Sequence, residues 1–110
     1  GVEHRIEFVL EKSGVKYYND SKATNPTSTI IALKSFTEPI NLILGGMNRS
    51  QDFHELDEVI NNVKCIYAIG EVTDIIDNYA KSVNIPCKKC YDLKTALLVV
   101  NNDNHLLHEL

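Results

Sequence analysis

Ile40-Asn41-Leu42-Ile43-Leu44-Gly45-Gly46 is the stretch of this 110-residue sequence that decides the fold. Its first five residues are mostly apolar and β-prone, which is typical of a strand buried on both faces of a parallel sheet. The two glycines that follow allow a ligand to approach the backbone closely at the end of the strand. Because parallel strands need long crossover connections, this stretch predicts an α/β fold.

Strand and helix patterns alternate on both sides of this stretch. Upstream, residues 6–11 and 15–18 predict a β-hairpin that turns at Gly14, and Pro26 begins a helix that runs to about Phe36. Downstream, apolar residues recur at helical spacing over 56–63, 72–80 and 93–100, and strands are predicted at 64–69 and 86–91. Asn101 to Asn104 are expected to break the last helix. The alternation predicts one α/β domain over 1–110, with a mainly parallel sheet, helices on both faces and an opening β-hairpin.

The bulk composition excludes several classes of protein. The chain is 44% hydrophobic and 24% charged, with a net charge of −4 and scattered basic residues. Nucleic acid is not expected as a partner, because phosphate binding needs a basic face. No apolar run has the length of a membrane span, and the N-terminus lacks a signal-peptide pattern, so we expect no membrane and a cytoplasmic location.

Three cysteines, Cys65, Cys87 and Cys90, are expected to be reduced thiols. The spacing of Cys87 and Cys90 is shared with redox motifs and zinc knuckles. A zinc site would need a second pair of ligands, for which only His105 and His108 are near in sequence. We favour incidental cysteines and no metal site, because the pair lies in a predicted strand and does not open a helix.

The loop Asn19-Asp20-Ser21-Lys22-Ala23-Thr24-Asn25-Pro26 joins a predicted strand to a helix. In an open α/β sheet, ligands bind at such strand ends. Asp20 is an acceptor for a ribose hydroxyl or a cation, Lys22 is a point charge for an anion, and Thr24 offers a hydroxyl. The residues alone leave open an anion site or a simple Asx-turn with a helix cap.

The second candidate loop follows the two glycines and runs to Phe53. Arg49 can form a bidentate pair with a carboxylate. The alternative is an ordinary connection in which Asp52 caps the next helix. His4-Arg5 is either a solvated strand end or a contact to a nucleotide or another domain, whereas His54-Glu55 fits the polar start of a helix. A phosphate-binding P-loop is absent from the sequence, as is a complete dinucleotide fingerprint.

Three blocks together resemble one known family. They are His4-Arg5-Ile6-Glu7, Asn19 to Pro26 and Leu42 to Phe53. In order and spacing they are similar to the C-terminal domain of the Mur ligases, and the second block resembles the members that add D-glutamate to UDP-N-acetylmuramoyl-L-alanine. The resemblance implies a Rossmann-like C-terminal domain of a three-domain, ATP-dependent amide ligase of peptidoglycan synthesis.

The resemblance also implies ligands and residue roles. ATP and Mg²⁺ would be held mainly by a central domain, and UDP-N-acetylmuramoyl-L-alanine by the other domains, so this domain alone would be inactive. His4, Arg5 and Asp20 would contact the nucleotide. Lys22 would be catalytic and, with Thr24 and Arg49, would bind D-glutamate.

The sequence departs from the family pattern in three places. Met47 stands where the family often has an acidic residue, and Arg49 where it has a lysine. The family also continues with a strand and a Ser-Pro loop that complete the D-glutamate pocket, and the sequence does not show them before Leu110. The alternative of another class is a small α/β interaction or regulatory module with no catalytic role, because fold does not imply function.

Overall fold

The structure is a computed structural model that describes residues 9–12, 15–20 and 26–109. Its strands and helices follow one another in the order that the apolar patterns predict, apart from two short 3₁₀ turns described below. They are β1 (Val9–Lys12), β2 (Val15–Asp20), α1 (Pro26–Lys34), β3 (Ile40–Leu44), η2 (Phe53–Leu56), η3 (Ile60–Asn62), β4 (Val63–Ile69), α2 (Thr73–Ser82), β5 (Cys87–Tyr91) and α3 (Leu93–Glu109).

The strands form one sheet in the order β1-β2-β3-β4-β5. The pairs β2–β3, β3–β4 and β4–β5 are parallel, and β1 pairs with β2 antiparallel. The prediction of a mainly parallel α/β sheet is therefore confirmed. Residues 6–8 and the turn at 13–14 lie outside the described residues, so the opening hairpin stays a prediction.

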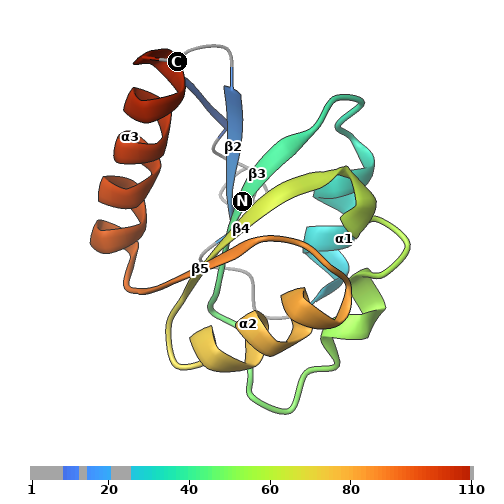
Figure 1. The fold of residues 1–110 in the computed structure, drawn as a ribbon. Coiled ribbons are helices and arrows are strands. Elements are labelled where there is room, and N and C mark those ends of the chain that lie inside the picture. Colours follow the sequence, from blue (N-terminus) through green and yellow to red (C-terminus); the bar gives the residue numbers. More distant parts are fainter. Residues whose placement is uncertain (1–8, 13–14, 21–25, 110) are drawn as a thin grey trace, which may run out of the picture.

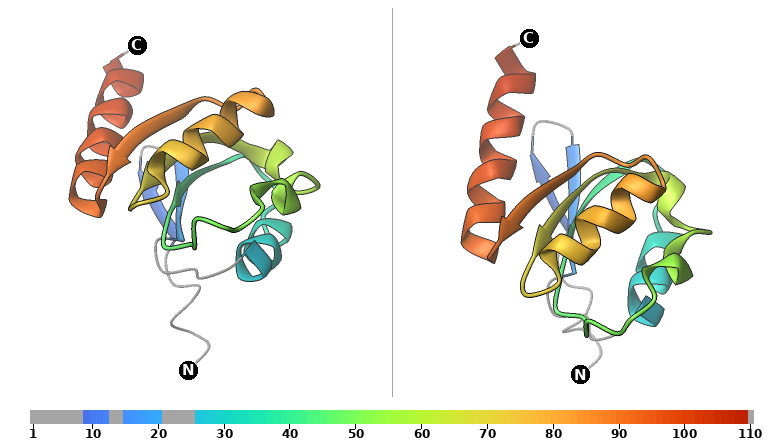
Figure 2. Two further views of the ribbon diagram at one scale, coloured as in Figure 1. Left: turned by 90° about the horizontal axis from the view of Figure 1, so that it is seen from below. Right: turned by 60° about the horizontal axis from the view of Figure 1, so that its bottom comes forward.

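Helices cover both faces of the sheet, as predicted (Figures 1 and 2). On one face, Leu42 and Ile66 of the central strands pack with α1 and α2 in the larger core. On the other face, Ile43 and Tyr67 pack with α3 in a second core. Because side chains alternate along a strand, neighbouring residues of β3 and β4 supply both cores. This explains why Ile40–Leu44 is buried along its whole length.

The helix predicted over 56–63 is wrong. Leu56 and Ile60 are buried, as their spacing suggested, but they lie in the two 3₁₀ turns, and Val63 already begins β4. Branched and asparagine side chains are poor helix formers. The Asn62 amide instead donates to the carbonyls of Phe36 (3.1 Å) and Glu38 (3.0 Å), which ties this segment to the end of α1. Burial alone therefore produced the helical spacing.

The expected break at 101–104 is also wrong, because α3 continues to Glu109. The segment contains neither glycine nor proline, and asparagine costs a helix only a fraction of a kcal/mol, roughly 0.7 at most. Asp103 also anchors it to the sheet. Its carboxylate accepts hydrogen bonds of 2.8 Å from the Tyr67 hydroxyl and of 2.8 Å from the Lys88 ammonium group. None of the helices in the described part of the chain is long and apolar enough to cross a membrane.

Candidate functional site

The candidate site lies at the edge of the sheet where the parallel strands end. Asp20, the last residue of β2, pairs in register with Leu44, the last residue of β3, and Leu44 pairs with Ala68 of β4. β2 and β3 therefore end side by side at this edge. In open α/β sheets this carboxyl edge is where ligands bind.

Glycine is required where β3 leaves the sheet. A Cβ added to Gly45 would lie 2.5 Å from Cγ1 and 2.8 Å from the carbonyl oxygen of Ile69 in β4. Gly46 follows with φ of +78°, a left-handed conformation that side chains disfavour. The two glycines thus serve close packing of β3 on β4 and a turn of the chain, in addition to any approach by a ligand.

The loop after β3 has an inward and an outward part. Met47 is buried in the larger core, whereas Arg49 is exposed two residues later. Asn48 lies between these two residues. Its side-chain oxygen accepts hydrogen bonds from the backbone N–H (2.8 Å) and the hydroxyl (2.9 Å) of Ser50, which follows Arg49. This Asx-type turn shapes the loop locally. Met47 thus anchors the loop in the larger core.

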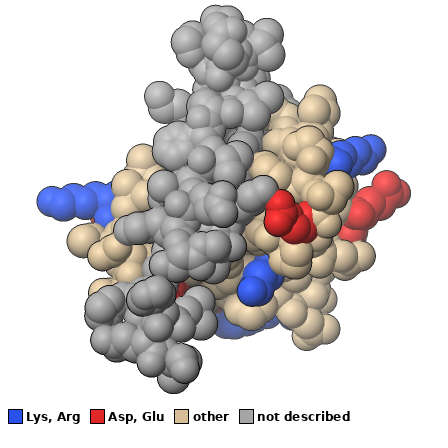
Figure 3. All heavy atoms as spheres, turned by 90° about the horizontal axis from the view of Figure 1, so that it is seen from above, with Lys and Arg blue, Asp and Glu red and all other residues tan. Residues whose placement is uncertain are grey.

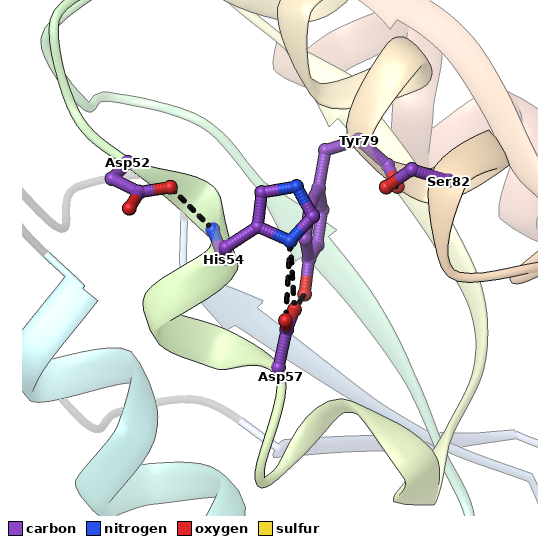
Figure 4. A network of polar contacts seen from close by, with 5 residues as sticks. All are labelled: Asp52, His54, Asp57, Tyr79 and Ser82. Carbon is purple, nitrogen blue, oxygen red and sulfur yellow. Dashed lines mark hydrogen bonds and ion pairs between the residues drawn. The ribbon is translucent and has the colours of Figure 1, made fainter.

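The loop ends in a network of polar and aromatic contacts, shown in Figure 4. Asp52 caps η2, because its carboxylate accepts a 3.0 Å hydrogen bond from the His54 N–H. The Asp57 carboxylate accepts a 2.9 Å hydrogen bond from the Tyr79 hydroxyl and lies 3.1 Å from Nδ1 of His54. A carboxylate only accepts, so Nδ1 carries the proton. Burial, and then the bond to Asp57, raise the pKa of Tyr79, which keeps the hydroxyl protonated as a donor.

Of the residues predicted for the site, the structure places two. Asp20 ends β2 at the carboxyl edge, and Arg49 projects from the neighbouring loop. His4, Arg5, Lys22 and Thr24 lie outside the described residues, so their roles stay predictions. The network of Asp57 and Tyr79 was not predicted. No short motif signals it, because the two residues stand 22 positions apart and Tyr79 fits the apolar stripe of its helix.

The far end of the carboxyl edge carries a strained turn at Tyr91. The Asp92 N–H donates to the carbonyl of Cys90 (2.8 Å) across Tyr91, whose φ is +68°. This is a γ-turn of the rarer, strained kind. The exposed Tyr91 hydroxyl donates a 2.7 Å hydrogen bond to Asp74 in the first turn of α2. Asp92 then caps α3 by accepting from the Thr95 N–H (2.7 Å), and this bond lowers the pKa of Asp92.

The cysteines do not form a site among the described residues. Cys87 packs against the larger core and Cys90 belongs to the second core, so the two thiols lie on opposite faces of the sheet. Burial and the nearby Asp77 raise the pKa of Cys87 to about 12, and burial also raises the pKa values of Cys65 and Cys90. All three are free thiols. Within the described ranges, no group of three or more metal-binding side chains comes together.

Other surface features lie apart from the carboxyl edge. An open hollow of about 320 Å³ lies near the opposite edge of the sheet, because its lining residues precede β3 and β4. They are Leu33, Lys34, Phe36, Thr37, Glu58, Val59, Asn61 and Asn62. Figure 3 shows one face of the molecule, on which acidic and basic side chains of the described residues lie interspersed.

Comparison with known proteins defines the class. Residues 4–102 match the family described as Mur ligase, glutamate ligase domain. The chain therefore belongs to this family.

The relatives narrow the class further, and each bears the name UDP-N-acetylmuramoylalanine–D-glutamate ligase. The protein of Macrococcus caseolyticus is 46% identical over 98 residues, which cover 89% of this chain and 22% of the relative. That of Listeria innocua is 41% identical over 104 residues (94% and 23%), and that of Clostridioides difficile is 49% identical over 83 residues (74% and 18%). The chain spans about a fifth of the length of the curated relatives it matches.

Proposed function

We propose that this chain serves as the amino-acid-binding and nucleotide-closing domain of an ATP-dependent ligase that adds D-glutamate to UDP-N-acetylmuramoyl-L-alanine in peptidoglycan synthesis. Membership of the glutamate ligase domain family supports this, as do the names of the relatives. The observation that supports the proposal is the register of Asp20 with Leu44, because β2 and β3, each followed in the sequence by one of the two motifs, end at one edge of the sheet.

Arg49 is suited to a dicarboxylate substrate. It is exposed at the carboxyl edge and makes no hydrogen bond or ion pair with another described residue. Its guanidinium group is therefore available for a bidentate pair with a carboxylate of D-glutamate. Lys22 and Thr24 belong to the neighbouring loop and would bind the same amino acid from the other side, with Lys22 next to the reacting amine.

The domain would contribute proximity. In the proposed reaction ATP phosphorylates the carboxylate of UDP-N-acetylmuramoyl-L-alanine and leaves as ADP. The amine of D-glutamate then attacks the acyl phosphate, the amide C–N bond forms, the C–O bond to phosphate breaks, and phosphate and the amine proton are released. Holding the two reactants in line can lower the barrier by roughly 7–11 kcal/mol. Closure of the domain over the nucleotide, through His4, Arg5 and Asp20, would exclude water that otherwise hydrolyses the activated group.

ATP and Mg²⁺ would be held mainly outside this domain. The sequence contains no P-loop that would bind the phosphates of ATP, and the described residues contain no group of three or more side chains that could bind a metal ion. Asp20, the last residue of β2, would contact the ribose of the nucleotide. The free thiols fit the reducing cytoplasm, where UDP-linked substrates would be used.

The test is kinetic and uses the full-length ligase that carries this domain. Arg49→Ala should raise the KM for D-glutamate about tenfold to a hundredfold, the scale of a charge-assisted hydrogen bond. Arg49→Lys should retain most of the affinity. Lys64→Ala is the control, because it removes an exposed cation near the start of β4, at the opposite edge. An unchanged KM for Arg49→Ala would refute the assignment of Arg49.

The loop after β2 is tested in the same way. Lys22→Ala and Thr24→Ala should impair the use of D-glutamate more than they impair folding, so soluble enzyme with weak D-glutamate dependence is expected. Insoluble or unfolded variants would instead favour a turn-and-cap role for the loop.

A further inference from the structure

Arg49 needs a rigid base, because an exposed arginine on a mobile loop loses conformational entropy when it binds a ligand. The near side of its loop is fixed by Gly45 against Ile69 and by Met47 in the core. The far side depends on Phe53 and the short η2 turn. A 3₁₀ turn of four residues has little stability of its own, so its contacts decide where it lies.

Those contacts converge on Tyr79 of α2. The Phe53 ring lies 6.0 Å from the Tyr79 ring, and the His54 ring meets it edge-on at 5.2 Å. Asp57, directly after η2, accepts from the Tyr79 hydroxyl and also contacts His54 (Figure 4). Tyr79 is only 5% exposed, so α2 presents it as a fixed point. Three residues of the segment after the loop thus contact one buried side chain.

We propose that Tyr79 and Asp57 are positioning residues for substrate binding: their hydrogen bond holds η2 against α2 and so sets the place of Arg49. The inference rests on the proposed function, because it assigns the network to the D-glutamate site. The rings of Phe53 and Tyr79 bring the segment to α2. The hydrogen bond from the Tyr79 hydroxyl to the Asp57 carboxylate also fixes the orientation of η2 relative to α2, since a hydrogen bond is directional and an apolar contact is not.

Tyr79→Phe is the decisive variant in the full-length ligase. It keeps the ring contacts and removes only the hydroxyl. We expect the KM for D-glutamate to rise roughly tenfold, with kcat nearly unchanged. This is the scale expected when a residue that orients a ligand-binding side chain, without touching the ligand itself, is lost. Asp57→Asn removes the negative charge that the Tyr79 hydroxyl and the His54 ring both contact, so it should also raise the KM for D-glutamate.

The chain offers a matched control in Tyr67→Phe. Tyr67 is also buried, and its hydroxyl also donates to an aspartate, Asp103, at 2.8 Å, but on the opposite face of the sheet. Both variants should lose similar thermal stability, and only Tyr79→Phe should raise the KM. Hydrogen exchange should likewise quicken at the amides of residues 50–57 in Tyr79→Phe and not in Tyr67→Phe.

Arg49→Ala separates the failure of this inference from the failure of the proposed function. If Arg49→Ala raises the KM, Tyr79→Phe added to it should raise the KM no further, because both act through one side chain. If Arg49→Ala raises the KM and Tyr79→Phe does not, the positioning role alone is overturned. An Arg49→Ala enzyme with normal KM overturns both. Equal KM effects of Tyr79→Phe and Tyr67→Phe would also overturn the positioning role, because they would reflect general destabilisation.

Discussion

Gly45→Ala should destabilise the domain, although alanine is usually tolerated better than glycine in folded chains. The added Cβ would lie 2.5 Å from Cγ1 and 2.8 Å from the carbonyl oxygen of Ile69. The side chain of Ile69 can rotate away, but its carbonyl oxygen belongs to β4 and cannot move alone. The substitution therefore forces β3 and β4 apart where the candidate site begins.

The magnitude follows from two opposing terms. Overpacking of this kind costs about 1–3 kcal/mol. Replacing glycine by alanine restricts the unfolded chain and returns about 0.4–1 kcal/mol. We therefore expect a net loss of about 1–2 kcal/mol in the free energy of unfolding. In urea this corresponds to a midpoint lower by roughly 1 M.

The control is Gly70→Ala at the end of β4. Among the described residues, the nearest atom to a Cβ there would be the backbone nitrogen of Gly46, at 3.8 Å, which is an ordinary contact distance. Its φ of +79° is the source of any cost, and Gly70→Asn should recover part of it because asparagine tolerates that conformation. Gly45→Asn should recover nothing. An unchanged or higher urea midpoint for Gly45→Ala would refute the close approach of β3 and β4.

Two further predictions concern titratable groups. Cys87, whose pKa is about 12, should react with iodoacetamide at pH 8 about a thousandfold more slowly than an ordinary thiol, and rapid labelling of the folded chain would contradict its burial. Asp92→Ala should lower the melting temperature, and the decrease should be larger at pH 6 than at pH 2. The folded-state pKa of Asp92 is lowered, so its contribution is complete above its ordinary pKa of about 4 and is lost as the pH falls through the lowered value. A difference in melting temperature that does not change with pH would count against the cap.

The sheet was predictable where one physical cause dominates. Ile40–Leu44 is mostly apolar because both of its faces are buried, and the structure forms the strand as predicted. The segment after it was not predictable in the same way. Leu56, Ile60 and Val63 are buried at helical spacing, but their burial comes from 3₁₀ turns and a strand start. A burial pattern does not identify the backbone that produces it.

Long-range side-chain contacts explain the other differences. Asp103 lies in a polar run that resembles a helix end, and only its bonds to Tyr67 and Lys88 show why α3 passes through it. The carboxyl edge was predictable as a candidate site from strand–loop order, and Arg49 is exposed there, but its role as a site stays a prediction. The partnership of Asp57 with Tyr79 depends on how α2 packs, which local sequence does not encode.

The most direct test of the proposed function is phosphate release by the full-length protein that contains this chain. The enzyme would receive ATP, UDP-N-acetylmuramoyl-L-alanine and, one at a time, a panel of D- and L-amino acids. We expect release above background with D-glutamate and not with L-glutamate or with the other amino acids. Release with a different amino acid, or with none, would contradict the proposed function, and absence of release with every amino acid would favour a small α/β interaction module.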